Sequence, residues 1–525
     1  MKFITRLFLF IFIINTAKAQ DSTLVISAPI DITQDGWNKV LQLSNGNTLL
    51  FHFEKRKGIV VKVYDKTHKE ISSKKHVPEI LDINALERIF FDALVEVNNE
   101  ALLFVTQDID NNETLIRLRY DGASGRFLGE EKVIKSQSFL KKISTYVLAR
   151  EGASDYAVFC YMSLPTDTVT EVKLIRYNDK HQMIAEIPYT VRSKAYDNVN
   201  FISAEMDPSG DIMATLQLAK IIQYPVLYDY TYVLLYMPKD ENKFVYSEVK
   251  MPTNMKVVNA KFTVNKFADN INMITTKEWL SAETKGLKNE TVGSVLQGMY
   301  IFPKDFSGVS SASFSCNKAN EYIRKHIDSN TSKYYGTIID QNTDDRGITT
   351  VVFESKSMPE SLYEKWIKYS PRAAGNLCVT KFDDKGDEIW ATVIPKTHYY
   401  VQMESKPVVF YSKNTQDLFS TVSLNTSKNH YILYNESEEN FKKTDFEKQS
   451  QLFDYTTTNA VLYSINRKNI VTKRHFFGGN AEGQFMHIYP GSQSFHKANK
   501  TLAIMMRKKA GKTESLHIAW RKMED

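Results

Sequence analysis

The segment VVKVYDKTHKE (Val60–Glu70) contains the unit that decides the fold of this chain: an apolar strand, a short polar turn and a second strand. The unit recurs at LIRLRYDGASGRF (Leu115–Phe127), KLIRYNDKHQMI (Lys173–Ile184), VLLYMPKDENKFVY (Val233–Tyr246), GMYIFPKDFSGV (Gly298–Val309), CVTKFDDKGDEIW (Cys378–Trp390) and LYSINRKNIV (Leu462–Val471). Its aromatic anchors Tyr64, Tyr120, Tyr177 and Tyr236 are 56, 57 and 59 residues apart. A period of this size, carried by hairpins, predicts a radially repeated all-β array.

Grouping the strands in fours extends the repeat over nearly the whole chain. The groups fall at 38–76, 87–135, 142–189, 198–250, 256–314, 334–395 and 408–476, with an incomplete hairpin at 484–520. The strand STLVISAP (Ser22–Pro29) has no group of its own, and pairing it with the last hairpin would close a ring and hide both sheet edges. We therefore expect a single closed β-propeller of about eight four-stranded blades, with seven as the alternative, and one short helix at Cys316–Asn330.

The first 19 residues predict export. Lys2 and Arg6 precede the apolar run LFLFIFII (Leu7–Ile14), and Ala17-Lys18-Ala19 is a small-x-small cleavage site. This pattern indicates a signal peptide over 1–19, too short to span a bilayer, and no later stretch is long and apolar enough to do so. We expect the propeller to occupy 20–525 and to reach the periplasm or the medium as a monomer.

Charge and cysteine content narrow the class of protein further. Removing residues 1–19 lowers the formal charge from +6 to +3, because two Lys and one Arg are lost and no acid. A nearly neutral chain of this length argues against a nucleic-acid partner. Cys160 and Cys378 lie in apolar, strand-like segments and are expected to be buried free thiols; whether any two of Cys160, Cys316 and Cys378 pair stays open.

The links between strands lengthen in the second half of the chain. The predicted insertions lie at 219–229, 278–294, 317–333, 356–375, 395–407 and 435–457. In a propeller, the links between second and third strands leave on the same face as the links between blades. The insertions therefore predict a one-sided cap, and loops on a rigid scaffold are where binding usually occurs. Functionally neutral growth of these loops is the alternative.

The candidate binding residues lie in these insertions and are mostly aromatic. They are Trp366, Tyr369, Arg372, His398, Tyr399 and Tyr400. Aromatic rings beside a guanidinium or an imidazole suit stacking against sugar rings or holding an extended peptide. The alternative is that these rings only pack the loops onto the blades.

Sequence motifs for chemistry are scarce. The eleven histidines form no HxH or HExxH pattern and no GxSxG occurs, so we expect no metal ion and no cofactor. The acid pairs Asp344-Asp345 and Asp383-Asp384 lie in turn-like segments, where Asp accepts local backbone hydrogen bonds. Carboxylates from different blades could still converge, which keeps a polysaccharide-acting hydrolase or lyase as the competing hypothesis.

Two resemblances follow from particular residues. Asp383-x-x-Gly386-x-x-x-Trp390 resembles the blade motif of quinoprotein-type propellers and their non-enzymatic relatives, in which the Trp docks adjacent blades. It occurs once, and no cofactor follows from it. Residues 375–520, through GNLCVTKFDDKGDEIWATVIPK (Gly375–Lys396), NHYILYNESEEN (Asn429–Asn440) and the final hairpin, resemble uncharacterised secreted bacterial repeat proteins. That resemblance implies a secreted propeller-like fold.

The leading hypothesis is a non-enzymatic exported binding or scaffolding protein whose insertion-built face holds a glycan, peptide or protein. A pocket beneath the insertions with two acids roughly 5–10 Å apart would favour a glycosidase instead. A broad aromatic groove without such a pair would favour binding.

Overall fold

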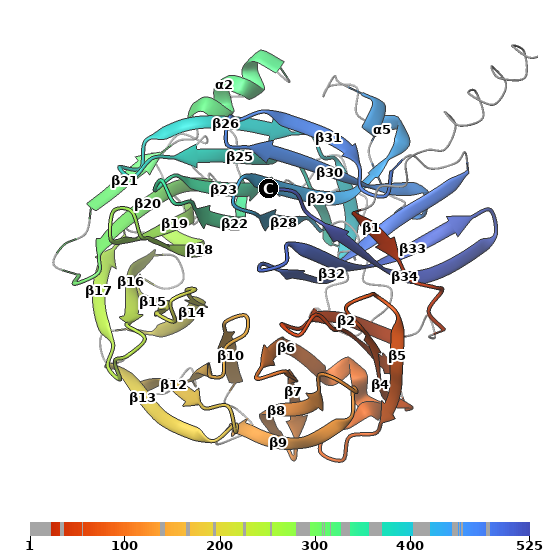
Figure 1. Ribbon diagram of the computed structural model, residues 1–525. Helices are drawn as coiled ribbons and strands as arrows, with labels where there is room; N and C mark the ends of the chain where they lie inside the picture. Colours follow the sequence, from red (N-terminus) through yellow and green to blue (C-terminus); the bar gives the residue numbers. More distant parts are fainter. Residues whose placement is uncertain are drawn as a thin grey trace, which may run out of the picture.

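Eight four-stranded antiparallel sheets surround a central opening in the computed structural model (Figure 1). Each sheet is a blade, numbered 1 to 8 here, and its first strand lies innermost. The fold is an eight-bladed β-propeller, as the repeat predicts. The structure describes residues 23–31, 36–54, 56–136, 142–163, 169–192, 196–223, 227–251, 255–279, 295–306, 308, 310–314, 317–326, 336–355, 370–402, 420–443, 450, 452, 455–478 and 483–525.

The blades follow one another along the chain. Blades 1 and 2 contain β2 (Gly36–Gln42), β3 (Thr48–Glu54), β4 (Gly58–Tyr64), β5 (Glu70–His76), β6 (Ile89–Val97), β7 (Glu100–Ile109), β8 (Asn112–Asp121) and β9 (Phe127–Lys135). Blades 3 and 4 contain β10 (Lys142–Ala149), β11 (Tyr156–Ser163), β12 (Val169–Tyr177), β13 (Met183–Arg192), β14 (Asn198–Met206), β15 (Ile212–Gln223), β16 (Leu227–Met237) and β17 (Val245–Lys250). Every predicted group of strands in this half corresponds to one blade.

The second half keeps the same order with added elements. Blades 5 and 6 contain β18 (Met255–Asn265), β19 (Asn270–Trp279), β20 (Val295–Pro303), β21 (Ser310–Phe314), β22 (Thr337–Thr343), β23 (Thr349–Glu354), β25 (Leu377–Phe382) and β26 (Glu388–Ile394). Blades 7 and 8 contain β28 (Val422–Asn425), β29 (Asn429–Ser437), β30 (Thr458–Asn466), β31 (Val471–His475), β32 (Gln484–His496), β33 (Thr501–Ala510), β34 (Thr513–Lys522) and β1.

The N-terminal strand closes the ring. β1 (Leu24–Ile26) runs antiparallel to β34, with Leu24 opposite Arg521. Just beyond it, the amide of Ser27 donates to the carbonyl of Ile518 at 2.9 Å. Blade 8 thus combines three C-terminal strands with one N-terminal strand, which covers the sheet edge that β34 would otherwise expose. The predicted closure is confirmed.

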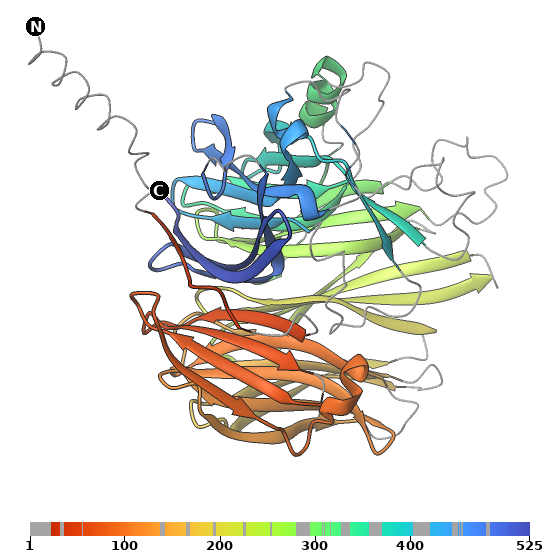
Figure 2. The ribbon, with the colours of Figure 1, turned by 90° about the vertical axis from the view of Figure 1, so that its right-hand side faces the viewer.

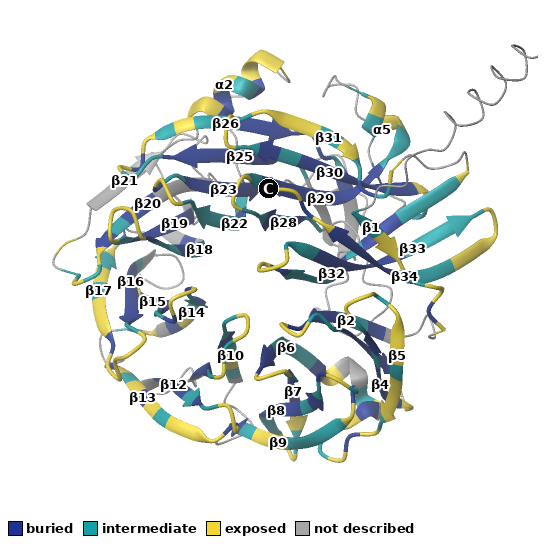
Figure 3. Ribbon diagram, viewed as in Figure 1, coloured by how far each residue is buried: buried dark blue, intermediate teal, exposed yellow. Residues whose placement is uncertain are grey.

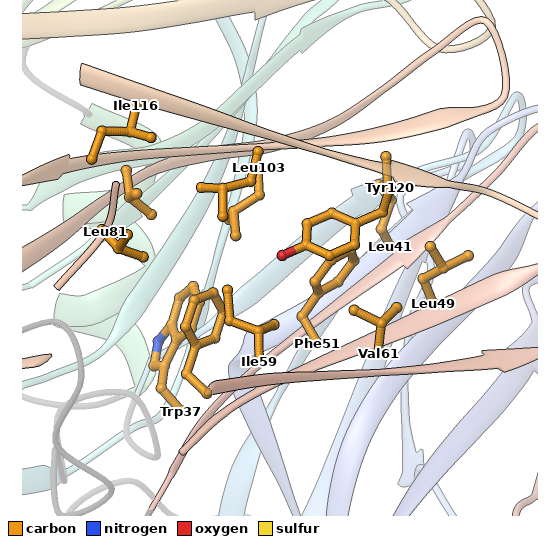
Figure 4. Packing of buried hydrophobic residues seen from close by; sticks show 14 of the residues in the cluster. Trp37, Leu41, Leu49, Phe51, Ile59, Val61, Leu81, Leu103, Ile116 and Tyr120 are labelled. Carbon is orange, nitrogen blue, oxygen red and sulfur yellow. The ribbon is translucent and has the colours of Figure 1, made fainter. Parts of the chain in front are cut away.

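Each interface between neighbouring blades contains its own apolar cluster. Successive side chains of a strand point to opposite faces of its sheet, so one strand serves two interfaces. In β3, Leu49 and Phe51 face blade 2, whereas Leu50 faces blade 8. Figure 4 shows Phe51 against Tyr120 of blade 2, edge to face with ring centres 5.1 Å apart. Eight clusters of this kind link the described parts of the ring, and burial falls toward the outer strands (Figure 3).

The recurring turn is held by a side-chain acceptor at its first residue. Asp65 Oδ1 accepts from the amides of Thr67 at 2.8 Å and Lys69 at 3.0 Å, while His68 takes a left-handed φ of 66°. Equivalent acceptors open the turns at Asn178, Asp207, Asp344, Asp383 and Asn466. The interpretation of Asp344 and Asp383 as turn-forming residues is therefore confirmed.

These turns join first to second and third to fourth strands, and they all emerge on one side of the ring, the hairpin face. The opposite side is the insertion face. There β24 (Ser370–Ala374), from the β23–β25 link, pairs with β27 (His398–Gln402), from the link between blades 6 and 7. This ribbon shows that both kinds of link leave the ring together, on the side away from the C-terminus in Figure 2.

Several predicted insertions contain regular structure. The segment 219–229 is mostly strand, because β15 continues to Gln223 and β16 begins at Leu227. Segments 356–375 and 395–407 include the paired strands β24 and β27 instead of loop alone. Segment 435–457 contains α5 (Glu438–Lys442) and η4 (Tyr455–Thr457), and the predicted helix is α2 (Asn317–His326). A further 3-10 helix, η1 (Ile83–Arg88), precedes blade 2.

The cysteines, Trp390 and the predicted signal peptide complete the comparison with the sequence-based predictions. Cys160 and Cys378 are buried and form no disulfide with each other, and Cys316 lies outside the described residues. Trp390 is partly buried against the cluster between blades 6 and 7, consistent with a blade-docking role. The predicted signal peptide also lies outside the described residues. Within the described residues, no helix has the length and apolar character needed to cross a membrane.

Candidate ligand-binding site at the axial opening

The first strands of the blades end around the central opening, and on the hairpin face their ends enclose a cavity of about 470 Å³. Five blades contribute to it: Leu41 and Gln42 of blade 1, Val95 and Glu96 of blade 2, Ala149, Arg150 and Glu151 of blade 3, Met206, Asp207 and Pro208 of blade 4, and Ser494, Phe495, His496 and Lys497 of blade 8. We call it the axial cavity. Its volume lies in the range typical of small-molecule sites.

A second cavity of about 320 Å³ adjoins the first. The two share Met206, Asp207, Pro208 and Lys497, and the second extends to the first-strand ends of blades 5 and 6. Glu205 lies in its wall, where burial raises the pKa of this carboxyl against the opposing effect of Lys261, whose Nζ is 3.7 Å away. Together the cavities follow most of the rim of the opening.

The three acids of the axial cavity already accept hydrogen bonds from the protein. Both carboxylate oxygens of Glu96 accept from the amide of Ser44 at 2.9 Å, and Oε1 also accepts from the Ser44 hydroxyl at 2.6 Å. Asp207 Oδ1 accepts from the amides of Gly210 and Asp211 within its turn. These carboxylates serve to hold loops in place and have little accepting capacity left for a ligand.

Glu151, the third acid, connects two blades that are not neighbours. It lies at the tip of the first hairpin of blade 3, and its Oε2 accepts from the amide of Lys497 in blade 8 at 3.1 Å. Its Oε1 lies 3.0 Å from Nδ1 of His496 and 3.5 Å from the amide of Ala498. This contact across the opening fixes the position of the 496–500 loop over the cavity.

The donors of the axial cavity are less completely used. His496 is 7% exposed, and its Nε2 is buried without a hydrogen-bond partner in the described part of the chain. Arg150 donates from its terminal nitrogens to Asp155 at 3.2 Å and to the carbonyl of Ser209 at 3.4 Å, while its Nε is likewise unpartnered there. The exposed Lys497 lies at both cavities. The site therefore offers mainly hydrogen-bond donors and a free imidazole nitrogen.

On the insertion face, the base of the ribbon contains a buried charge network. Lys396 Nζ lies 2.7 Å from Glu354 Oε1, and Thr421 Oγ1 lies 2.8 Å from that ammonium and donates to the same carboxylate oxygen at 3.0 Å. His398, fully buried, has its Nε2 3.7 Å from Glu436. Burial lowers the pKa of His398. Burial opposes ionisation of Glu436, but the nearby His398 imidazole and the hydrogen bonds from the Ser437 amide and the Asn440 side chain lower the pKa of that carboxyl overall.

Of the six sequence-predicted site residues, the structure describes the side chain of one. His398 faces the interior, packed edge to face on Tyr434 with ring centres 5.7 Å apart, so its surroundings are those of a core residue. Arg372 lies opposite Tyr400 in the ribbon, and Tyr399 precedes Tyr400 on the same strand. Trp366 and Tyr369 lie outside the described residues.

The residues of the axial cavity were not predicted from the sequence. A signal was present: the predicted blades place Gln42, Glu96, Arg150, Asp207 and His496 at equivalent positions, where each first strand ends. Superposing the predicted blades on one another would have gathered these polar residues at one rim. The lengthened loops, by contrast, lie on the other face.

Comparisons with known proteins give a likeness of fold only. No family model and no curated protein sequence matches the chain. The WD40 domain of SCAP from fission yeast aligns over 96% of this chain and 98% of its own length, with 8% identity and a TM-score of 0.37. Prolyl oligopeptidase B from Galerina marginata aligns at 8% identity and a TM-score of 0.41, and the match spans 56% of that protein. A Synechocystis apocarotenoid oxygenase aligns over 95% of this chain, with 8% identity and a TM-score of 0.33.

Proposed function

We propose that this protein is an exported, non-enzymatic binding protein that holds a small polar ligand in the axial cavity. The observation that carries the proposal is the composition of that cavity: residues from five blades converge on a volume of about 470 Å³, and its acids are occupied by internal hydrogen bonds. Convergent polar groups in a preformed concave site are typical of ligand-binding proteins.

The competing proposal of a hydrolase or lyase with its acids beneath the insertions has less support. A glycosidase needs a carboxylic acid with a raised pKa beside a second, ionised carboxylate. Beneath the insertions, Glu354 is neutralised by Lys396, and the pKa of Glu436 is lowered, so neither carboxyl suits the role of proton donor. Both lie in the network that anchors the ribbon.

A cavity-filling variant tests the proposal. Ala149 lies in the wall of the axial cavity, and we expect Ala149→Phe to abolish the thermal shifts that wild-type protein gives with a library of small polar solutes. Ala123→Phe, at an exposed turn position on the same face, is the matched control and should respond like wild type. Circular dichroism confirms that each variant is folded. Equal responses from both variants would overturn the axial location.

The aromatic residues of the insertion face stay a second proposed surface, for a glycan, peptide or protein. The observation in their favour is the register of the ribbon, which brings Arg372 and Tyr400 opposite each other. A glycan array or pull-down that compares wild type with the double variant Trp366→Ala/Tyr399→Ala tests it, and equal binding would remove this surface from consideration.

Export is tested separately. We expect the mature protein to begin at Gln20 and to be recovered outside the cytoplasm, as N-terminal sequencing of fractionated cells would show. Recovery of the intact Met1 form in the cytoplasm would contradict it.

A further inference from the structure

We propose, resting on the proposed function, that the ligand of the axial cavity is a small hydroxylated anion, a sugar carboxylate or sugar phosphate. Lys497 and Arg150 would hold its anionic group, and Nε2 of His496 would donate a hydrogen bond to the oxygen of one of its hydroxyl groups. Three independent features of the described residues lead to this class of ligand.

The first feature is the balance of donors and acceptors at the cavity. Glu96, Glu151 and Asp207 together accept seven hydrogen bonds from backbone amides or from Ser44, whereas Lys497 has no acidic partner among the described residues. Because most of the accepting capacity of these carboxylates is used, a ligand that supplies acceptors of its own fits the cavity best. Anionic oxygens satisfy Lys and Arg donors best, because such charge-assisted bonds are about twice as strong as neutral ones.

The second feature is the orientation of His496. Its Nδ1 accepts a hydrogen bond from the amide of Asn499 at 3.3 Å and lies 3.0 Å from the Glu151 carboxylate. Because Nδ1 is an acceptor, the neutral ring carries its proton on Nε2, which is therefore a donor. Nε2 is buried and unpartnered in the described chain, and a buried polar atom without a partner is costly. The oxygen of a ligand hydroxyl group would satisfy it by accepting a hydrogen bond.

The third feature is the charge of the two blades that flank this part of the opening. Residues 36–76 of blade 1 carry nine Lys or Arg against three Asp or Glu, and residues 483–525 of blade 8 carry eight against three. The whole chain has 67 Lys or Arg and 61 Asp or Glu, so the rest of the chain has 50 basic residues against 55 acidic ones. Blades 8 and 1 are neighbours and both line the cavity, so their net positive charge would offset the carboxylates of Glu96, Glu151 and Asp207 in its wall.

Isothermal titration with glucuronate, glucose 6-phosphate and neutral glucose tests the inference. We expect at least one of the two anions to bind and glucose to bind at least about tenfold more weakly, since the charge-assisted contacts are lost. Binding of only one anion would assign the anionic group as carboxylate or phosphate. Glucose binding as tightly as both anions would overturn the ligand class and leave the proposed function standing. If neither anion binds, the proposed ligand class is also overturned. The screen of small polar solutes described above then tests independently whether the axial cavity binds a ligand.

Matched variants locate the contacts. Lys497→Gln should weaken anion binding about tenfold, whereas Lys512→Gln, which makes the same charge change at an exposed turn of blade 8 on the insertion face, should leave it unchanged. His496→Phe should weaken binding of the hydroxylated anions without changing the affinity for inorganic phosphate. If Lys497→Gln and Lys512→Gln weaken anion binding equally, the loss of affinity comes from long-range attraction alone, which would contradict a direct contact with Lys497.

Discussion

The hairpin face and the insertion face are built at opposite ends of the same strands, yet their loops are stabilised in different ways. Hairpin-face turns are short, and a side chain such as Asp65 or Asp344 accepts the amides of its own turn. At blades 6 and 7 of the insertion face, a buried ion pair between Lys396 and Glu354 holds the base of a longer ribbon. Loop length therefore does not locate the cavity. Ring geometry does, because it brings the ends of the first strands together.

The largest expected effect concerns the insertion face. Lys396→Met would leave the Glu354 carboxylate buried without its cation, and we expect a loss of about 3–5 kcal/mol in the free energy of unfolding. Urea-induced unfolding measures it. Lys57→Met is the control, because its partner Glu54 forms an exposed pair, and such pairs contribute about 0–1 kcal/mol. Equal losses of unfolding free energy in the two variants would show that the buried ion pair stabilises the fold no more than the exposed one.

Closure of the ring is the next test, since both faces depend on it. Deleting Thr23–Ser27 removes β1 and uncovers the edge of β34. At about 1 kcal/mol for each net backbone hydrogen bond, we expect a loss of about 3 kcal/mol, together with self-association through the bare edge. Thermal unfolding and size-exclusion chromatography follow the two effects. A variant with unchanged stability that stays monomeric would show that β1 is dispensable.

Acid should weaken the hairpin face through His430. Burial lowers the pKa of His430 to about 4, so the folded protein keeps this imidazole neutral. An unfolded histidine titrates near 6.5, and stability from this group is therefore present above pH 6.5 and lost as the pH falls toward 4. The loss is up to about 3 kcal/mol. His430→Gln should flatten the pH profile of unfolding between pH 6.5 and 4; an unchanged profile would contradict the assignment.

Much of the fold followed from the sequence, because the repeat is local. The turn after Tyr64, Tyr120 and Tyr177 needs only neighbouring residues, and closure by Ser22–Pro29 follows from counting strands. The site did not follow in the same way. The contact of Glu151 with His496 joins residues 345 positions apart across the ring, and no local pattern specifies which two loops meet. The burial of His398 was missed for a related reason: its partner Glu436 belongs to the next blade.

The smallest expected effect comes from a hairpin-face turn that lies outside the axial cavity. Asp383→Ala removes the acceptor for the amides of Lys385 and Asp387, at 3.0 and 2.9 Å, and should cost about 1 kcal/mol without changing ligand affinity. Thermal unfolding and calorimetry on the same preparation measure both quantities. Reduced affinity in this variant would mean that hairpin-face turns influence binding beyond those that line the axial cavity.

Hydrogen–deuterium exchange can show which face binds the ligand, because it reports on both faces of the unmodified protein in one experiment. With glucuronate, or the solute that gives the largest thermal shift, we expect slower amide exchange at the hairpin tips 150–155 and 496–500, which border the axial cavity. The ribbon residues 370–374 and 398–402 should exchange as in the free protein. Protection confined to the ribbon, with unchanged exchange at 150–155 and 496–500, would contradict the axial site and return the ligand to the insertion face.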